Sequence, residues 1–130
     1  MVMKLLDTTF LIDILKGKPE TTAILHGQDP LFTTQINMYE IITGLFFKNL
    51  PPSKILQVRE LFEDVRVLPL DERAIVKAAE ICAELMKKGE MIEDCDCLIA
   101  GIALSNGVSA IVTKNIKHFE RIKGIKVERY

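Results

Sequence analysis

The sequence predicts an α/β fold in which a central parallel sheet is covered by helices on both faces. Its expected strands are short, continuous apolar runs rather than alternating ones, as in strands buried on both sides. Helical segments separate these runs along the whole chain, and no repeat or low-complexity tract interrupts them. A length of 130 residues lies in the commonest size range for one domain, so we expect a single domain over residues 1–130.

Polar and turn-forming residues mark the elements of the first half of the chain. Residues 1–6 form an apolar run that stops at Asp7, which predicts a strand with Asp7 at its carboxyl end. Thr8 or Thr9 then caps a helix that runs through Leu15 and ends near Gly17. The remaining elements expected here are a short helix over 19–26, a strand over 31–33 and a helix over 35–47.

The second half continues the same alternation. Ser53 follows two prolines and is expected to cap a helix over 53–64, and Asp71 is expected to cap a long helix that ends near Lys88. Residues 95–104 have apolar positions at helical spacing, and Gly107 is suited to end that helix. The remaining expected strands cover 65–68, 110–112 and 125–127.

Three acidic residues stand beside apolar runs that lie far apart in the sequence. Asp7 follows the first strand, while Glu40 and Asp96 lie in early turns of two helices that follow the sheet edge. Ligands bind outside the carboxyl ends of parallel strands, so these carboxylates are expected to meet there. Carboxylates are rarely buried without a charged partner or a metal, which predicts one shared site completed by a cation.

The residue types at this site favour metal-dependent hydrolysis. Carboxylate oxygens suit Mg²⁺ or Mn²⁺, and such an ion lowers the pKa of a bound water. We expect Asp7 and Asp96 to be direct metal ligands and Glu40 to be a ligand through water or a general base. Asp94 is a further candidate, although it faces the site only if it precedes its helix, and its alternative role is that of a helix cap. Asn115 is another candidate, and its alternative role is that of a turn-forming residue.

Four motifs in the same order carry a resemblance to a known family: Leu6-Asp7-Thr8-Thr9-Phe10-Leu11-Ile12-Asp13, Tyr39-Glu40-Ile41-Ile42-Thr43-Gly44, Ile92-Glu93-Asp94-Cys95-Asp96-Cys97-Leu98-Ile99-Ala100, and Val112-Thr113-Lys114-Asn115 followed by His118-Phe119-Glu120-Arg121-Ile122. With them, essentially the whole chain resembles the PIN-domain ribonucleases, and most closely the VapC-type toxins of toxin-antitoxin pairs. Two positions depart from the pattern. Thr9 stands where an asparagine is usual, and Asn115 stands where many PIN domains carry a fourth acidic residue, which puts a second metal in doubt.

The resemblance implies an endoribonuclease that hydrolyses RNA phosphodiester bonds with Mg²⁺ or Mn²⁺. It implies an acidic site made from Asp7, Glu40 and Asp96, with Asn115 at the position of the fourth acid. It also implies two protein partners, a second copy in a homodimer and a VapB-type antitoxin that lies across the active-site cleft. Apolar residues that could form either surface are Leu45, Phe46, Phe47, Leu50, Ile55, Leu56, Leu61 and Phe62, with ordinary core as the alternative.

Composition limits the other classes. Lys and Arg number 17 against 18 Asp and Glu, so any nucleic-acid binding must be local, and the basic residues after position 113 are the candidates. No apolar run approaches the roughly 20 residues of a membrane span and no export signal opens the chain, so a cytoplasmic protein without membrane contact is expected. The three cysteines predict free thiols, and Cys95, Cys97, His26 and His118 match no zinc spacing.

Three other functions remain open on the sequence alone. An aspartate that ends the first strand also opens the haloacid-dehalogenase phosphotransferase motif, but that motif needs a second acid where Thr9 stands. A degenerate PIN fold that only binds is favoured by Asn115 and opposed by Asp7, Glu40 and Asp96. A PIN nuclease that processes RNA outside a toxin pair would carry the same residues.

Overall fold

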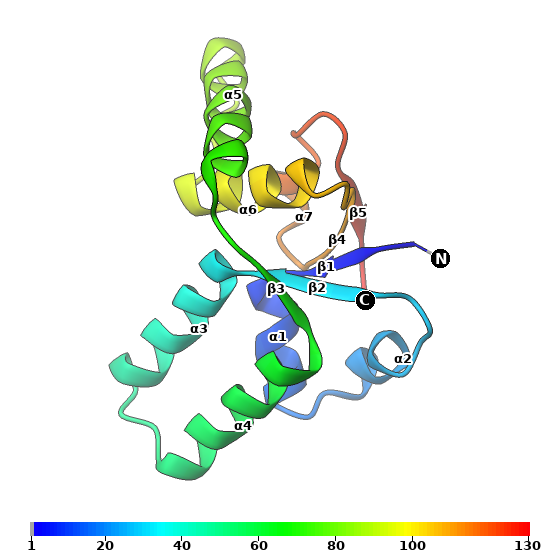
Figure 1. The fold of residues 1–130 in the computed structure, drawn as a ribbon, viewed down its shortest axis with the longest axis vertical. Coiled ribbons are helices and arrows are strands. Elements are labelled where there is room, and N and C mark those ends of the chain that lie inside the picture. The colour runs from blue at the N-terminus through cyan, green and yellow to red at the C-terminus, as the bar shows by residue number, and fades with distance from the viewer. Residues whose placement is uncertain (1) are drawn as a thin grey trace.

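The computed structural model describes residues 2–130 and confirms the predicted α/β architecture. Five parallel strands form one sheet in the order β3-β2-β1-β4-β5, with β1 at its centre (Figure 1). The strands are β1 (Lys4–Leu6), β2 (Leu31–Thr34), β3 (Arg66–Leu68), β4 (Ala110–Val112) and β5 (Lys126–Glu128). The helices are α1 (Thr8–Leu15), α2 (Thr22–Leu25) after a short 3₁₀ turn (Pro19–Thr21), α3 (Gln35–Phe47), α4 (Pro52–Asp64), α5 (Glu72–Lys88), α6 (Asp94–Ser105) and α7 (Ile116–Phe119).

Helices cover both faces of the sheet. Successive residues of a strand point to opposite sides, so one strand contributes apolar side chains to both faces. Leu5 and Leu6 in β1 are both fully buried, and each belongs to a different apolar cluster. Leu5 packs with residues of α5, α6 and α7, whereas Leu6 packs with residues of α1, α3 and α4. Figure 1 shows these two groups of helices on opposite sides of the strands. The short apolar runs thus correspond to strands that are buried on both faces.

Helices α5 and α6 approach each other closely at Gly101. A Cβ added there would lie 2.7 Å from both the Cβ and the backbone nitrogen of Ala78, and 2.8 Å from the carbonyl oxygen of Ala74. Two alanines on α5 therefore face a residue without a side chain on α6. This contact fixes the position of α6, the helix that carries Asp96.

The structure corrects two predicted helix starts and confirms a third. Helix α1 begins at Thr8 with Asp7 at the N-cap, because the Thr8 hydroxyl is engaged with Glu40 and does not cap the backbone. Helix α4 begins one residue before Ser53, since the fixed φ of a proline suits the first turn of a helix. Asp71 caps α5 as predicted, and its Oδ1 accepts a hydrogen bond of 2.9 Å from the backbone nitrogen of Ala74.

Other sequence expectations are also met in the described part of the chain. The cysteines Cys82, Cys95 and Cys97 are all free. Burial raises the pKa of the Cys97 thiol to about 12, which keeps this side chain protonated. Between residues 2 and 130, no helix is long and apolar enough to cross a membrane.

Candidate active site

The acidic residues gather at the edge of the sheet where the parallel strands end. Asp7 follows β1 directly, Asn37 lies in the first turn of α3 after β2, and Thr113 follows β4. Strands β2 and β4 both pair with β1, so their carboxyl ends lie on either side of Asp7. Residues separated by about a hundred positions in sequence thus become neighbours around one carboxylate.

Asp7 is the buried centre of this group, with 3% of its surface exposed. The hydroxyl of Thr113 donates to its Oδ2 at 2.6 Å, and the side-chain amide of Asn37 donates to its Oδ1 at 3.1 Å. Burial raises the pKa of Asp7 although both bonds oppose the shift, and the charge of Asp96 raises it further. The fold therefore holds this carboxylate in one orientation in an environment that disfavours its charge.

Asn37 orients Asp7 and was not singled out in the sequence. Its Oδ1 accepts bonds from the hydroxyl and the backbone nitrogen of Thr34, at 2.6 and 3.2 Å, while the Thr34 hydroxyl oxygen accepts from the backbone nitrogen of Asn37. This reciprocal capping box starts α3 and fixes the side chain. The amide of Asn37 is thereby directed to Asp7 and, at 3.0 Å, to the hydroxyl of Thr8. A Thr-x-x-Asn spacing after an apolar strand was the available signal.

Glu40 lies one turn beyond Asn37 on α3 and is half-buried. The hydroxyl of Thr8 donates to its Oε1 at 2.7 Å, which ties α3 to the start of α1. Burial raises the pKa of Glu40, and the charges of Asp7 and Asp96 raise it further. This electrostatic coupling shows that the three carboxylates predicted from sequence share one region.

Asp96 approaches from the other side of the sheet edge, as the third residue of α6. It is 7% exposed, and its Oδ2 lies 2.6 Å from Nδ1 of His118 and accepts from the side-chain amide of Asn115 at 3.1 Å. Burial raises the pKa of Asp96, the bond and charge of His118 oppose that shift, and the charge of Glu93 adds to it. His118 is therefore a further member of the site, although on the sequence alone it was named only in the closing motif, among the late basic residues and as an unsuitable zinc ligand.

Thr113 links the end of β4 to the rest of the group. Its hydroxyl is fully buried, donates to Asp7 and accepts from the backbone nitrogen of Asn115 at 2.9 Å. Thr9 lies 3.3 Å from the same hydroxyl and accepts from the backbone nitrogen of Lys114 at 3.0 Å. Thr9 therefore occupies a polar position beside the site, although an asparagine is usual there.

The structure does not bring Asp94 into this group. Helix α6 begins at Asp94, so this residue does not precede the helix, and its side chain is exposed. The acid that does precede the helix is Glu93, at the N-cap, and its charge acts on Glu40 and Asp96. Asp94 therefore does not meet the condition under which it was expected to face the site, because the helix starts one residue earlier than expected.

The donor set fits a hard divalent cation in its chemistry. In the described chain, from residue 2 onward, no three His, Cys, Asp or Glu side chains already lie in an arrangement that could hold a metal ion. Asp7, Glu40 and Asp96 nevertheless offer carboxylate oxygens, which accept more than one bond each. The charge of Asp96 raises the pKa of Asp7, and the charges of Asp7 and Asp96 raise the pKa of Glu40. A bound cation would relieve that repulsion.

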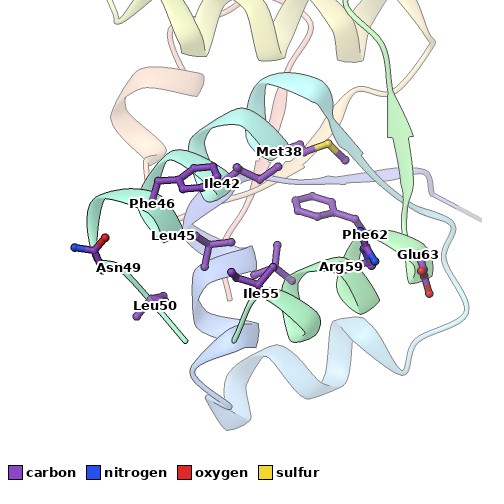
Figure 2. Close-up of a pocket in the computed structure, with 11 residues that line it drawn as sticks. Met38, Ile42, Leu45, Phe46, Asn49, Leu50, Ile55, Arg59, Phe62 and Glu63 are labelled. Carbon is purple, nitrogen blue, oxygen red and sulfur yellow. The ribbon is translucent and has the colours of Figure 1, made fainter. Parts of the chain in front are cut away.

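A separate apolar groove lies between α3 and α4, on the face of the sheet that α1 also covers (Figure 2). Ile42, Leu45 and Phe46 of α3 point toward Ile55 and Phe62 of α4 across a cavity of about 650 Å³. Phe46 is 76% exposed, and its neighbour Phe47 is 86% exposed. Of the apolar residues predicted here, Leu61 is buried core, whereas Phe46, Phe47, Ile55 and Leu56 form surface.

The fold and the acidic group define a small α/β domain of the nuclease type. The PIN domain family model matches residues 4–125. A tRNA(fMet)-specific endonuclease VapC from Salmonella typhimurium is 36% identical over 98% of this chain and 98% of its own length. Ribonuclease VapC1 from Methanocaldococcus jannaschii is 32% identical over 95% of this chain and 85% of its own length. The chain belongs to the PIN-domain family and, within it, to the VapC ribonucleases.

Solved structures give the same assignment. The DNA-bound VapBC complex from Salmonella typhimurium contains a chain that superposes with a TM-score of 0.86 at 32% identity, over 99% of this chain and 98% of that one. VapBC-1 from nontypeable Haemophilus influenzae gives a TM-score of 0.83 at 29% identity, over 98% of both chains. Both neighbours come from toxin-antitoxin complexes.

Proposed function

We propose that this protein is a Mg²⁺- or Mn²⁺-dependent endoribonuclease and the toxin of a VapBC pair, with residues 1–130 acting as one PIN domain. The observation that carries the proposal is the meeting of Asp7, Glu40 and Asp96 at one sheet edge, where burial raises the pKa of each and neighbouring acidic charges raise it further. Such a group is costly for a fold unless a cation completes it.

Each site residue receives a role from its contacts. Asp7 and Asp96 would hold the cation, which when bound supplies positive charge at the scissile phosphate and lowers the pKa of a coordinated water. Glu40 keeps one oxygen without a protein partner, so it would orient the attacking water and accept its proton. Burial and the neighbouring acidic charges raise the pKa of Glu40, which makes it a stronger base.

Thr113, Asn37, Asn115 and His118 are positioning residues. Thr113 and Asn37 hold the two oxygens of Asp7, while Asn115 and His118 hold Oδ2 of Asp96. Asn115 carries no charge, so it orients an acidic ligand rather than supplying a fourth one. Asp94 is left out of the proposed group because it is exposed and begins α6 rather than preceding it.

Initiator tRNA is the first substrate to test. Two relatives, from Salmonella typhimurium and Shigella flexneri, are named tRNA(fMet)-specific endonucleases, at 36% and 29% identity. We propose that this chain cleaves the same class of RNA.

The groove between α3 and α4 is the proposed docking surface for a VapB-type antitoxin. Its apolar lining and the exposed Phe46 would be covered in such a complex. We further propose that two copies of the chain form a homodimer in the cytoplasm. Light scattering of the purified protein, alone and with its copurified partner, measures both associations.

The central experiment incubates purified protein, freed of any partner, with initiator tRNA and a structured RNA pool. We expect cleavage in Mg²⁺ or Mn²⁺ that is lost in EDTA and in Asp96→Asn. Asp64→Asn is the matched control, because it removes an exposed carboxylate at the end of α4, outside the acidic group. Cleavage that persists in Asp96→Asn refutes the site, and metal binding without any cleavage indicates a binding module.

A further inference from the structure

We infer that the RNA strand crosses the acidic group between two basic hollows, each of which binds a phosphate that flanks the scissile one. This inference rests on the proposed nuclease function and adds the path of the substrate. The requirement is electrostatic: three carboxylates repel a polyanion, and one divalent cation at the centre offsets only part of that repulsion. Cations on either side are needed to hold the neighbouring phosphates.

The first hollow adjoins Asp96. It has a volume of about 440 Å³ and lies between the β4–α7 connection and Arg129. Asn115 and His118 line it and also contact Asp96, so these two residues belong to both the hollow and the acidic group. Its charged lining residues are Lys114, which pairs with Asp13, one acid, Glu120, and the exposed Lys117 and Arg129, which make no ion pair within residues 2–130.

The second hollow adjoins Glu40, on the opposite side of the group. Its volume is about 200 Å³, and it lies between α1, α3 and the start of α4. Its floor is apolar, and its charged lining residues are Glu40 and three exposed lysines, Lys16, Lys48 and Lys54, which would hold a phosphate at its surface. None of them is ion-paired in the described structure.

The charge distribution along the sequence supports this path. Residues 114–130 carry six Lys and Arg against two Glu, whereas residues 1–113 carry 11 basic against 16 acidic residues. A chain with a net charge of −1 therefore concentrates positive charge beside its acidic site. Phosphates, which need local cations, are the ligand class that matches unpaired lysine and arginine on both flanks.

Binding and cleavage can be measured separately. A fluorescently labelled single-stranded RNA oligonucleotide is titrated in EDTA, where no metal-dependent cleavage occurs, at salt concentrations from 50 to 200 mM. The logarithm of affinity falls with the logarithm of salt by about 0.7 for each phosphate contact to a single strand. Lys117→Ala/Arg129→Ala and Lys16→Ala/Lys48→Ala should each reduce that slope by about 1.4.

The matched control is Arg73→Ala/Lys87→Ala, which removes the same number of exposed positive charges from α5, outside both hollows. This control should keep the wild-type slope. In Mg²⁺, the hollow variants should raise KM by more than they lower kcat. The proposed RNA path would be overturned if the salt slopes of the hollow variants equalled that of the control, or if the wild type bound no RNA at 50 mM salt.

Two other results separate the hollows from the proposed function. If the hollow variants reduce the salt slope but the wild-type protein cleaves no RNA, the hollows bind RNA as inferred and the proposed nuclease function is refuted. Unchanged slopes together with weaker binding of the copurified antitoxin would assign the hollows to the protein partner and overturn the inference.

Discussion

Replacing Gly101 by alanine tests the close contact that positions α6. The added methyl group would lie within 2.8 Å of three atoms of α5, namely Cβ and the backbone nitrogen of Ala78 and the carbonyl oxygen of Ala74. None of these atoms is the end of a flexible side chain, so the two helices must separate. Overpacking of this kind costs about 1–3 kcal/mol.

A second glycine supplies the matched control. Gly44 lies in α3, and a Cβ added there meets no atom within 4 Å. Gly44→Ala should therefore show only the helix-propensity gain, up to about 1 kcal/mol of added stability. Gly101→Ala has the same gain and the packing cost, so it should be less stable than Gly44→Ala by about 1–3 kcal/mol.

Urea unfolding of the two variants and the wild type measures this difference. For a chain of this size, 1 kcal/mol corresponds to a Tm shift of about 4 °C, so thermal unfolding gives an independent value. Gly101→Ala should also cleave RNA more slowly, because displacement of α6 moves Asp96. Equal stability of the two alanine variants would refute the packing argument.

Three further predictions concern the buried polar groups. Because burial raises the pKa of Asp7, the metal-free protein should lose stability as the pH rises through this raised pKa and the buried carboxyl group ionises. Asp7→Asn should be inactive, yet urea unfolding at pH 7 should show that it is more stable than the wild type. Tyr130→Phe removes a 2.7 Å bond to Asp13 and should cost about 1.5–3 kcal/mol at pH 7. Burial opposes ionisation of Asp13, but bonds from Lys114, Tyr130 and Lys18 hold its pKa far below normal, so that cost should shrink only as pH falls well below about 4, through the lowered pKa. Thr113→Val removes the bond to Oδ2 of Asp7 and the acceptor of the backbone nitrogen of Asn115, and should cost about 2–3 kcal/mol, which Thr113→Ser should largely restore.

The order of elements was predictable from the sequence because buried parallel strands leave a clear signal. Runs such as Ala110–Val112, between helical segments, indicate strands without reference to any contact. The same rule placed Asp7 and Thr113 at one edge, since both directly follow strands. Helix starts were less predictable, and a shift of one residue at α6 placed Asp94 in the helix and Glu93 at its N-cap.

The side chains that orient the carboxylates could not be found in this way. Asn37 reads as an ordinary polar residue of a helix, and its role depends on β2 and β1 lying side by side. His118 reaches Asp96 across 22 positions of sequence, from a helix of only four residues. Such contacts follow from tertiary geometry, which periodicity and spacing do not contain.

The chain connectivity determines when the site can exist during synthesis. Its central strand, β1, is made first, whereas its neighbour β4 and the hydroxyl that holds Asp7 are made near the end. A chain interrupted between Asp96 and Thr113 has Asp7 without that bond and Asp96 without Asn115 and His118. Such an unfinished translation product has all three acids but no assembled site. A premature stop codon at almost any position of the gene would therefore give a product without an assembled site.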